Sequence, residues 1–127
     1  MKVWQRRLGI IWVVALIIWL PIEDTQVWLS LVLALAACIW LGMRLLTTRA
    51  KFRIWQANAY GAVLGAGVPL IAISLMAFKS GLHGHGFPDF TARQVWSMWS
   101  AVPYGLALGG LLGFASRLFF VHGGKTN

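Results

Sequence analysis

The stretch Ala101–Val121, which reads AVPYGLALGGLLGFASRLFFV, decides the fold of this chain. It is apolar over about 20 residues, the length that a helix needs to cross a membrane. Small residues recur in it at every fourth position: Ala101, Gly105, Gly109 and Gly113. On a helix these positions share one face and leave it almost without side chains. Helices in lipid associate through such faces, because the two backbones approach closely there.

The apolar run at 57–78 carries a row with the same spacing, formed by Ala57, Gly61 and Gly65. We therefore expect the two runs to pack closely, either against each other or against a second copy of the chain. Pro69 lies near the middle of the run at 57–78. Because its ring removes a helix hydrogen bond and crowds the preceding turn, it predicts a kink or hinge there.

Two further apolar runs, 4–22 and 27–44, precede these. Of the 127 residues, 59% are hydrophobic and 11% charged, whereas soluble domains carry about 25% charged residues. In the first run, Lys2, Arg6 and Arg7 precede the apolar stretch Leu8–Ile22, as in a signal peptide. The stretch lacks the small residues of a cleavage site at its end and is interpreted as part of an uncleaved span. The sequence thus predicts one all-α integral membrane domain, a compact antiparallel bundle of four transmembrane helices with spans at 4–22, 27–44, 57–78 and 101–121.

The net charge of +8 would suggest nucleic acid in a soluble protein. Here most basic residues fall at the amino terminus, in the segment 44–56 and near the carboxyl terminus, whereas the acids Glu23, Asp24 and Asp89 fall in the other connections. This is the positive-inside pattern, so we expect cytoplasmic termini in a bacterial-type plasma membrane and no nucleic acid. The basic segment 44–53 is either a solvated cytoplasmic loop or a contact with anionic lipid.

A short amphipathic helix is predicted at 91–100, before the last span. Thr91 and Gln94 have the spacing of a capping box, which marks a helix start. Val95, Trp96 and Trp99 share one face of that helix with Ala92. We expect this face to anchor the helix in the outer membrane interface or on a partner.

The connection between the third span and this helix, 79–90, is predicted to be a glycine- and proline-rich loop. His83 and His85, with Asp89 nearby, form its one possible metal site. In an extended segment the two imidazoles face the same side and suit Zn²⁺ or Cu²⁺, but a closed site needs about four ligands. The alternatives are a solvated loop, a pH-sensing site, or haem or pigment ligation.

No known catalytic signature is present, and Cys38 is the single cysteine. No acidic residue lies inside a predicted span, which argues against proton-coupled transport. Asn58, Ser74 and Ser116 are interpreted as polar residues that bond across helices. The sequence favours a non-enzymatic accessory subunit or assembly factor of a larger membrane complex, without a cofactor. The alternative is a small homodimeric transporter, channel or lipid-handling protein; a third is an enzyme or cofactor carrier that uses a metal ion at the histidine loop.

Overall fold

The computed structural model describes residues 3–22, 27–48, 53–83 and 90–123. These residues form five helices and no strand. The helices are α1 (Val3–Trp19), α2 (Val27–Thr48), α3 (Ile54–His83), α4 (Ala92–Ser100) and α5 (Val102–Gly123). The all-helical fold therefore agrees with the prediction.

Among the described residues, three stretches are long and apolar enough to cross a membrane: Val27–Leu45, Ile54–Leu82 and Ala92–Ser116. The third includes α4 and much of α5. With 17 residues, α1 is shorter than the roughly 20 residues that a span needs. The three long apolar stretches suggest a membrane protein.

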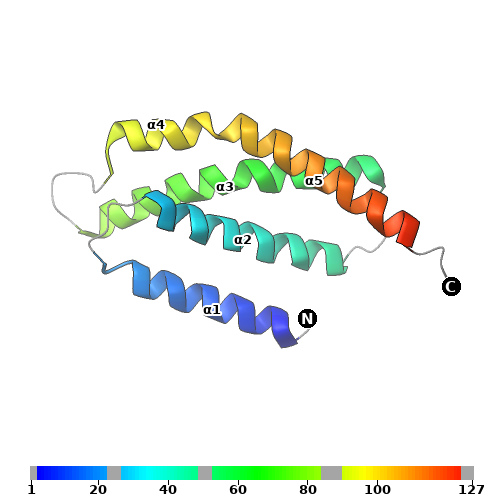
Figure 1. The fold of residues 1–127 in the computed structure, drawn as a ribbon. Helices are drawn as coiled ribbons and strands as arrows, with labels where there is room; N and C mark the ends of the chain where they lie inside the picture. The colour runs from blue at the N-terminus through cyan, green and yellow to red at the C-terminus, as the bar shows by residue number, and fades with distance from the viewer. Residues whose placement is uncertain (1–2, 23–26, 49–52, 84–89, 124–127) are drawn as a thin grey trace.

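The long helices lie side by side in an open row (Figure 1). Neighbouring helices run in opposite directions, so that the start of α1 and the end of α5 lie at the same end of the molecule. The most extensive packing is between α3 and α5, followed by that between α2 and α3, while α1 packs mainly on α2. This arrangement is more open than the compact bundle that the sequence predicts.

Both connections around α3 differ from the prediction, because the helices continue into them. α2 extends to Thr48, so the helix takes in the first part of the basic segment predicted as a loop. α3 extends to His83, so the predicted loop at 79–90 loses its first five positions to the helix. The reason is packing, since Met76 and Lys79 are both buried and keep the last turns of α3 in the core. Pro69 also lies within α3 and does not interrupt it.

The helix predicted before the last span is present, and its capping box is confirmed by the reciprocal bonds of Thr91 and Gln94. It ends at a turn at Ala101, two residues before Pro103, which has no N–H to donate to the preceding turn. Figure 1 shows α4 running on into α5 in nearly the same direction along α3. The position of this helix in the outer membrane interface stays a prediction.

The core gathers where α1 ends, α2 begins and α3 ends. Its buried members are Trp19, Leu33, Met76 and Phe90. Val95 and Met98 of α4 pack against this cluster. Phe90 and Val95 occupy the two positions of a hydrophobic staple around the start of α4, which fixes the angle at which the chain enters that helix. The opposite end of the molecule has no comparable cluster among the described residues.

Candidate functional site

The two rows of small residues face each other within one chain. α3 and α5 meet so closely that a Cβ added at Gly61 or Gly65 would overlap the backbone of α5. The reverse also holds, because a Cβ at Gly105 or Gly109 would overlap the backbone of α3. Gly113 meets Ala57 in the same way. Ala101, the first member of the α5 row, forms the turn between α4 and α5 instead.

An apolar groove of about 360 Å³ lies beside this contact. It runs between α2 and α5, and α3 forms its floor. Its polar lining is small, consisting of the side chains of Cys38, Tyr60 and Ser116. The other lining residues are apolar or glycine: Leu35, Ile39, Gly42, Met43, Leu45, Ala57, Gly61, Leu64, Gly65, Val68, Gly109, Leu112 and Gly113. A site of this composition suits hydrocarbon and contains no group for acid–base or nucleophilic chemistry.

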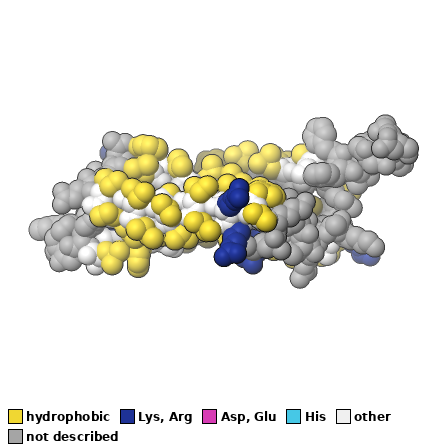
Figure 2. All heavy atoms as spheres, turned by 90° about the horizontal axis from the view of Figure 1, so that it is seen from below, with side chains coloured by type: hydrophobic (Ala, Val, Ile, Leu, Met, Phe, Trp, Pro, Cys, Tyr) yellow, Lys and Arg dark blue, Asp and Glu magenta, His cyan; other side chains and the backbone are white. Residues whose placement is uncertain are grey.

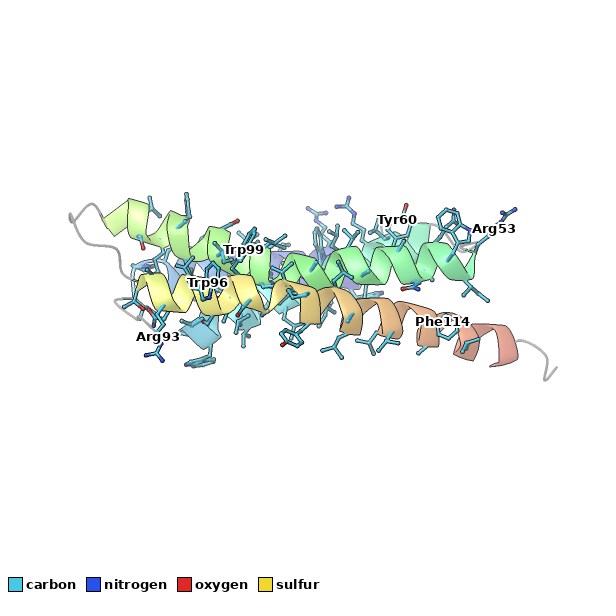
Figure 3. All side chains as sticks on the ribbon, turned by 90° about the horizontal axis from the view of Figure 1, so that it is seen from above. Arg53, Tyr60, Arg93, Trp96, Trp99 and Phe114 are labelled. Atoms are coloured by element: carbon cyan, nitrogen blue, oxygen red, sulfur yellow. The ribbon has the colours of Figure 1, made fainter. Side chains whose placement is uncertain are left out.

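One end of the groove lies where α3 begins, at the end of the molecule that carries Arg44 and Arg53. Arg53 precedes Ala57 by one helical turn, on the face of α3 that lines the groove. In Figure 3, Arg53 and Tyr60 project to the same side of α3, and Arg53 is exposed. At this same end, the Arg44 guanidinium lies 5.4 Å from the centre of the Trp40 ring, on the side of α2 that faces α1.

A buried cation lies at the opposite end, in the core cluster. Lys79 is 1% exposed, and its Nζ lies 4.5 Å from the centre of the Trp19 ring. Lys79 falls in the segment predicted as a loop, so this contact is not among the predicted ones. The spacing of Pro69, Ala72, Met76 and Lys79 is the signal that would have found it, because these four buried residues follow one face of α3.

The residues predicted to form one anchoring face of α4 point in different directions in the structure. Val95 packs inward on the core cluster together with Met98. Trp96 and Trp99 point away from the core and are 69% and 55% exposed. Figure 3 shows the two tryptophans along α4, with Arg93 projecting at its start. The aromatic pair is therefore open to contact by lipid or by another protein, while the helix that carries it is fixed from behind.

Tryptophans also hold α1 to α2, a role that the sequence analysis did not assign. Trp12 Nε1 donates to Leu33 O at 2.8 Å, and Trp40 Nε1 donates to Gln5 O at 2.9 Å. The sequence position of Trp12 indicates such a bond, because an indole N–H in the middle of an apolar run needs an acceptor. These bonds join neighbouring helices through backbone carbonyls.

Two of the three polar residues expected to bond across helices bond within their own helices instead. Ser74 donates to Leu70 O and Ser116 to Gly113 O, both within their own helices. Asn58 lies with its side-chain oxygen against Gly110 of α5. Thus the two serines satisfy themselves locally, and only Asn58 reaches across an interface.

His85, Asp89 and the side chain of His83 lie outside the described residues. Among the side chains that are described, no group of three His, Cys, Asp or Glu residues could hold a metal ion. The metal site at His83, His85 and Asp89 therefore stays a prediction.

Comparison of the chain with protein-family models, with curated proteins and with solved structures finds no match.

Proposed function

We propose that this protein is an integral membrane protein with four spans, formed by α1, α2, α3 and the continuous pair α4–α5. Large apolar side chains are exposed along all of the long helices. Figure 2 shows one such face, where hydrophobic side chains cover most of the described surface and Lys and Arg side chains lie beside one end of it. A bilayer would cover this surface, which in water would be an aggregation hazard. Snorkelling of Arg6 and Arg7 would extend the short α1 to the headgroups.

The proposed orientation follows from the described arginines. Arg6, Arg7, Arg44 and Arg53 belong to helix ends that meet at one end of the molecule. The opposite end carries Lys79, which is buried, and Arg93. By the positive-inside rule the end with the four arginines is cytoplasmic, in a plasma membrane of bacterial type. Both chain termini would then lie inside.

Within that membrane, we infer a non-enzymatic accessory subunit or assembly factor of a larger complex. The observation that carries this proposal is the aromatic surface formed by Trp96 and Trp99 on α4, which are 69% and 55% exposed. Large aromatic side chains that are presented on a fixed helix supply much of the binding energy at protein interfaces. α4 is fixed by its capping box and by Val95 and Met98, so the surface is prepared before a partner arrives.

The described interior is consistent with a packing role. Its buried polar side chains belong to Gln5, Ser30 and Lys79. Ser30 donates to Val27 O within α2, Gln5 contacts Met43 O of α2, and Lys79 lies over Trp19. Each of these contacts stabilises a helix or a pair of helices. None of them brings together the nucleophile, base and orienting group that covalent catalysis requires.

Substitution of Trp96 and Trp99 tests the proposed role as a subunit of a larger complex. The protein is extracted in a mild detergent and the mass of the intact complex is measured for wild type and for two double variants. Trp96→Ala with Trp99→Ala should lose a stoichiometric foreign subunit, because each buried indole contributes about 1.5–3 kcal/mol. Trp28→Ala with Trp55→Ala, which removes two other exposed tryptophans, should keep it. A wild-type sample that holds only copies of this chain would contradict the proposal.

The alternative is a small homodimeric transporter, channel or lipid-handling protein. The apolar groove between α2 and α5 favours the lipid-handling form of this alternative, since its lining suits hydrocarbon and not a polar solute. Purified protein in liposomes that moves a fluorescent lipid between leaflets, as a homodimer without foreign subunits, would support it over the accessory role.

A further inference from the structure

We propose that the groove between α2 and α5 binds one acyl chain of an anionic phospholipid, whose phosphate lies at Arg53. The proposal is independent of the protein partner suggested for the aromatic surface, which lies on α4. It rests on the length and the lining of the groove, and on the charge at one of its ends.

The length of the groove matches one leaflet. Its lining on α3 begins at Ala57 and ends at Val68. Eleven residues of helix correspond to about 16 Å. Half of a hydrocarbon core is about 15 Å thick. A groove of this length accommodates the chain of a lipid from one leaflet, with the headgroup at the end where α3 begins.

The lining of the groove is shaped for hydrocarbon. Glycines form part of its floor and edge, so that a chain lies directly against the helix backbones. Leu35, Ile39 and Leu112 are exposed and flank it as apolar walls. The hydroxyl of Ser116 is already engaged with Gly113 O and presents no donor to the groove. Burial of a hydrocarbon chain here therefore desolvates few polar groups.

The charge at one end selects the headgroup. Arg53 is exposed, lies one turn beyond Ala57 on the lining face, and is at the end of the molecule that also carries Arg6, Arg7 and Arg44. A guanidinium at this level binds a lipid phosphate through paired hydrogen bonds. Its side chain needs no rearrangement of the fold to do so, because its backbone N–H already bonds Gln56 Oε1 and fixes the start of α3.

Lipid retention tests the proposal. The full chain is incorporated into nanodiscs that contain equal amounts of phosphatidylglycerol and phosphatidylcholine, and then transferred to a mild detergent. The phospholipid that remains bound per protein is measured by mass spectrometry. Wild type should keep about one phosphatidylglycerol per chain, in preference to phosphatidylcholine, because the inner end of the groove is basic.

Two pairs of variants test separately how the groove and the charge of Arg53 contribute to lipid retention. Leu112→Trp fills the groove and should lower retention about tenfold or more, because the chain loses its apolar burial. Leu111→Trp makes the same change at a neighbouring exposed residue outside the groove and should keep the lipid. Arg53→Gln should lower the preference for phosphatidylglycerol about fivefold. Arg93→Gln, at the opposite end, should leave it unchanged.

The same measurements define the contrary results. Equal losses for Leu112→Trp and Leu111→Trp would overturn the groove as the site, and equal retention of the two lipids by wild type would overturn the role of Arg53. Wild type could instead be free of lipid and form a dimer or a complex with another protein. If Leu112→Trp dissociates that assembly, a helix occupies the groove and the proposal is wrong. If Leu112→Trp does not fold, as judged by its elution profile and helicity, Ile39→Trp fills the same groove from α2 and replaces it in the comparison.

Discussion

Lys79 Nζ lies 4.5 Å from the centre of the Trp19 ring, and both side chains are buried. The contact joins the end of α1 to the last turns of α3, although α1 packs mainly on α2. An ammonium over an indole face contributes about 2 kcal/mol or more when it is shielded from water. Lys79 therefore links α1 to α3 at the end where the core cluster lies.

Trp19→Leu should lower the free energy of unfolding by about 2–4 kcal/mol, because it removes the ring beneath Lys79 and leaves a cavity in the core cluster. The loss is measured by titration with a denaturing detergent, with helicity followed by circular dichroism. Trp28→Leu changes an exposed tryptophan on α2 and should alter stability by less than about 0.5 kcal/mol.

A second substitution shows whether the two residues act as a pair. Lys79→Met keeps an unbranched side chain and removes the buried charge, so it should cost less than Trp19→Leu. In the double variant the two losses should not add, because they remove the same contact. Strict additivity of the two changes would contradict the link between α1 and α3.

Gly109→Ala should destabilise the protein by about 1–3 kcal/mol, because the added methyl group overlaps the backbone of α3 at Gly61 and Gly65 and forces the helices apart. Gly81→Ala is the matched control on α3. A Cβ at Gly81 meets nothing within 4 Å, so this change should be neutral or should stabilise the helix by up to about 1 kcal/mol. The same detergent titration measures both variants. Equal effects would remove the case for backbone contact between α3 and α5.

A disulfide can report the same interface within one chain. Cysteines at Gly65 and Gly109 are unsuitable, since a Cβ at either position overlaps backbone. The Cβ of Ala62 lies 3.6 Å from that of a side chain built at Gly110, which is within the usual range of about 3.5–4.5 Å. Only the flexible end of Asn58 has to move. Ala62→Cys with Gly110→Cys, in a Cys38→Ser background, should therefore form an intrachain bond on mild oxidation.

Gel mobility with and without reductant measures that bond. Ala62→Cys with Leu111→Cys should not close, because Leu111 is exposed and lies on another face of α5. A disulfide-linked dimer in place of the intrachain product would show that the two rows face a second copy.

The spacing of glycines in α3 and α5 could be interpreted from the sequence because close approach of backbones depends on one local property, the absence of side chains at every fourth position. The start of α4 could be predicted for a similar reason, since the bonds of Thr91 and Gln94 are local. What the sequence left open was the partner of each row. That choice depends on the whole chain, and the structure places the two rows against each other.

Other features could not be predicted from local patterns. Lys79 was assigned to a loop because a charged residue ends an apolar run, whereas in the structure the Trp19 ring covers it. α4 has apolar residues on more than one side, so amphipathicity alone could not decide that Val95 and Met98 face inward and Trp96 and Trp99 outward. The groove between α2 and α5 arises from the relative positions of three helices, which no single segment encodes.

The proposed topology predicts a difference between the two ends of α3. Gly81→Cys and Arg53→Cys place single thiols at exposed positions near these ends, in a Cys38→Ser background. A Cβ at Gly81 meets no neighbour within 4 Å, so its thiol is accessible without a change in packing. If the arginine-bearing end is cytoplasmic, a membrane-impermeant maleimide added to intact cells should label Gly81→Cys, and Arg53→Cys only after the membrane is permeabilised. Labelling of Arg53→Cys on intact cells, with Gly81→Cys protected, would reverse the orientation; labelling of both would rule out α3 as a span.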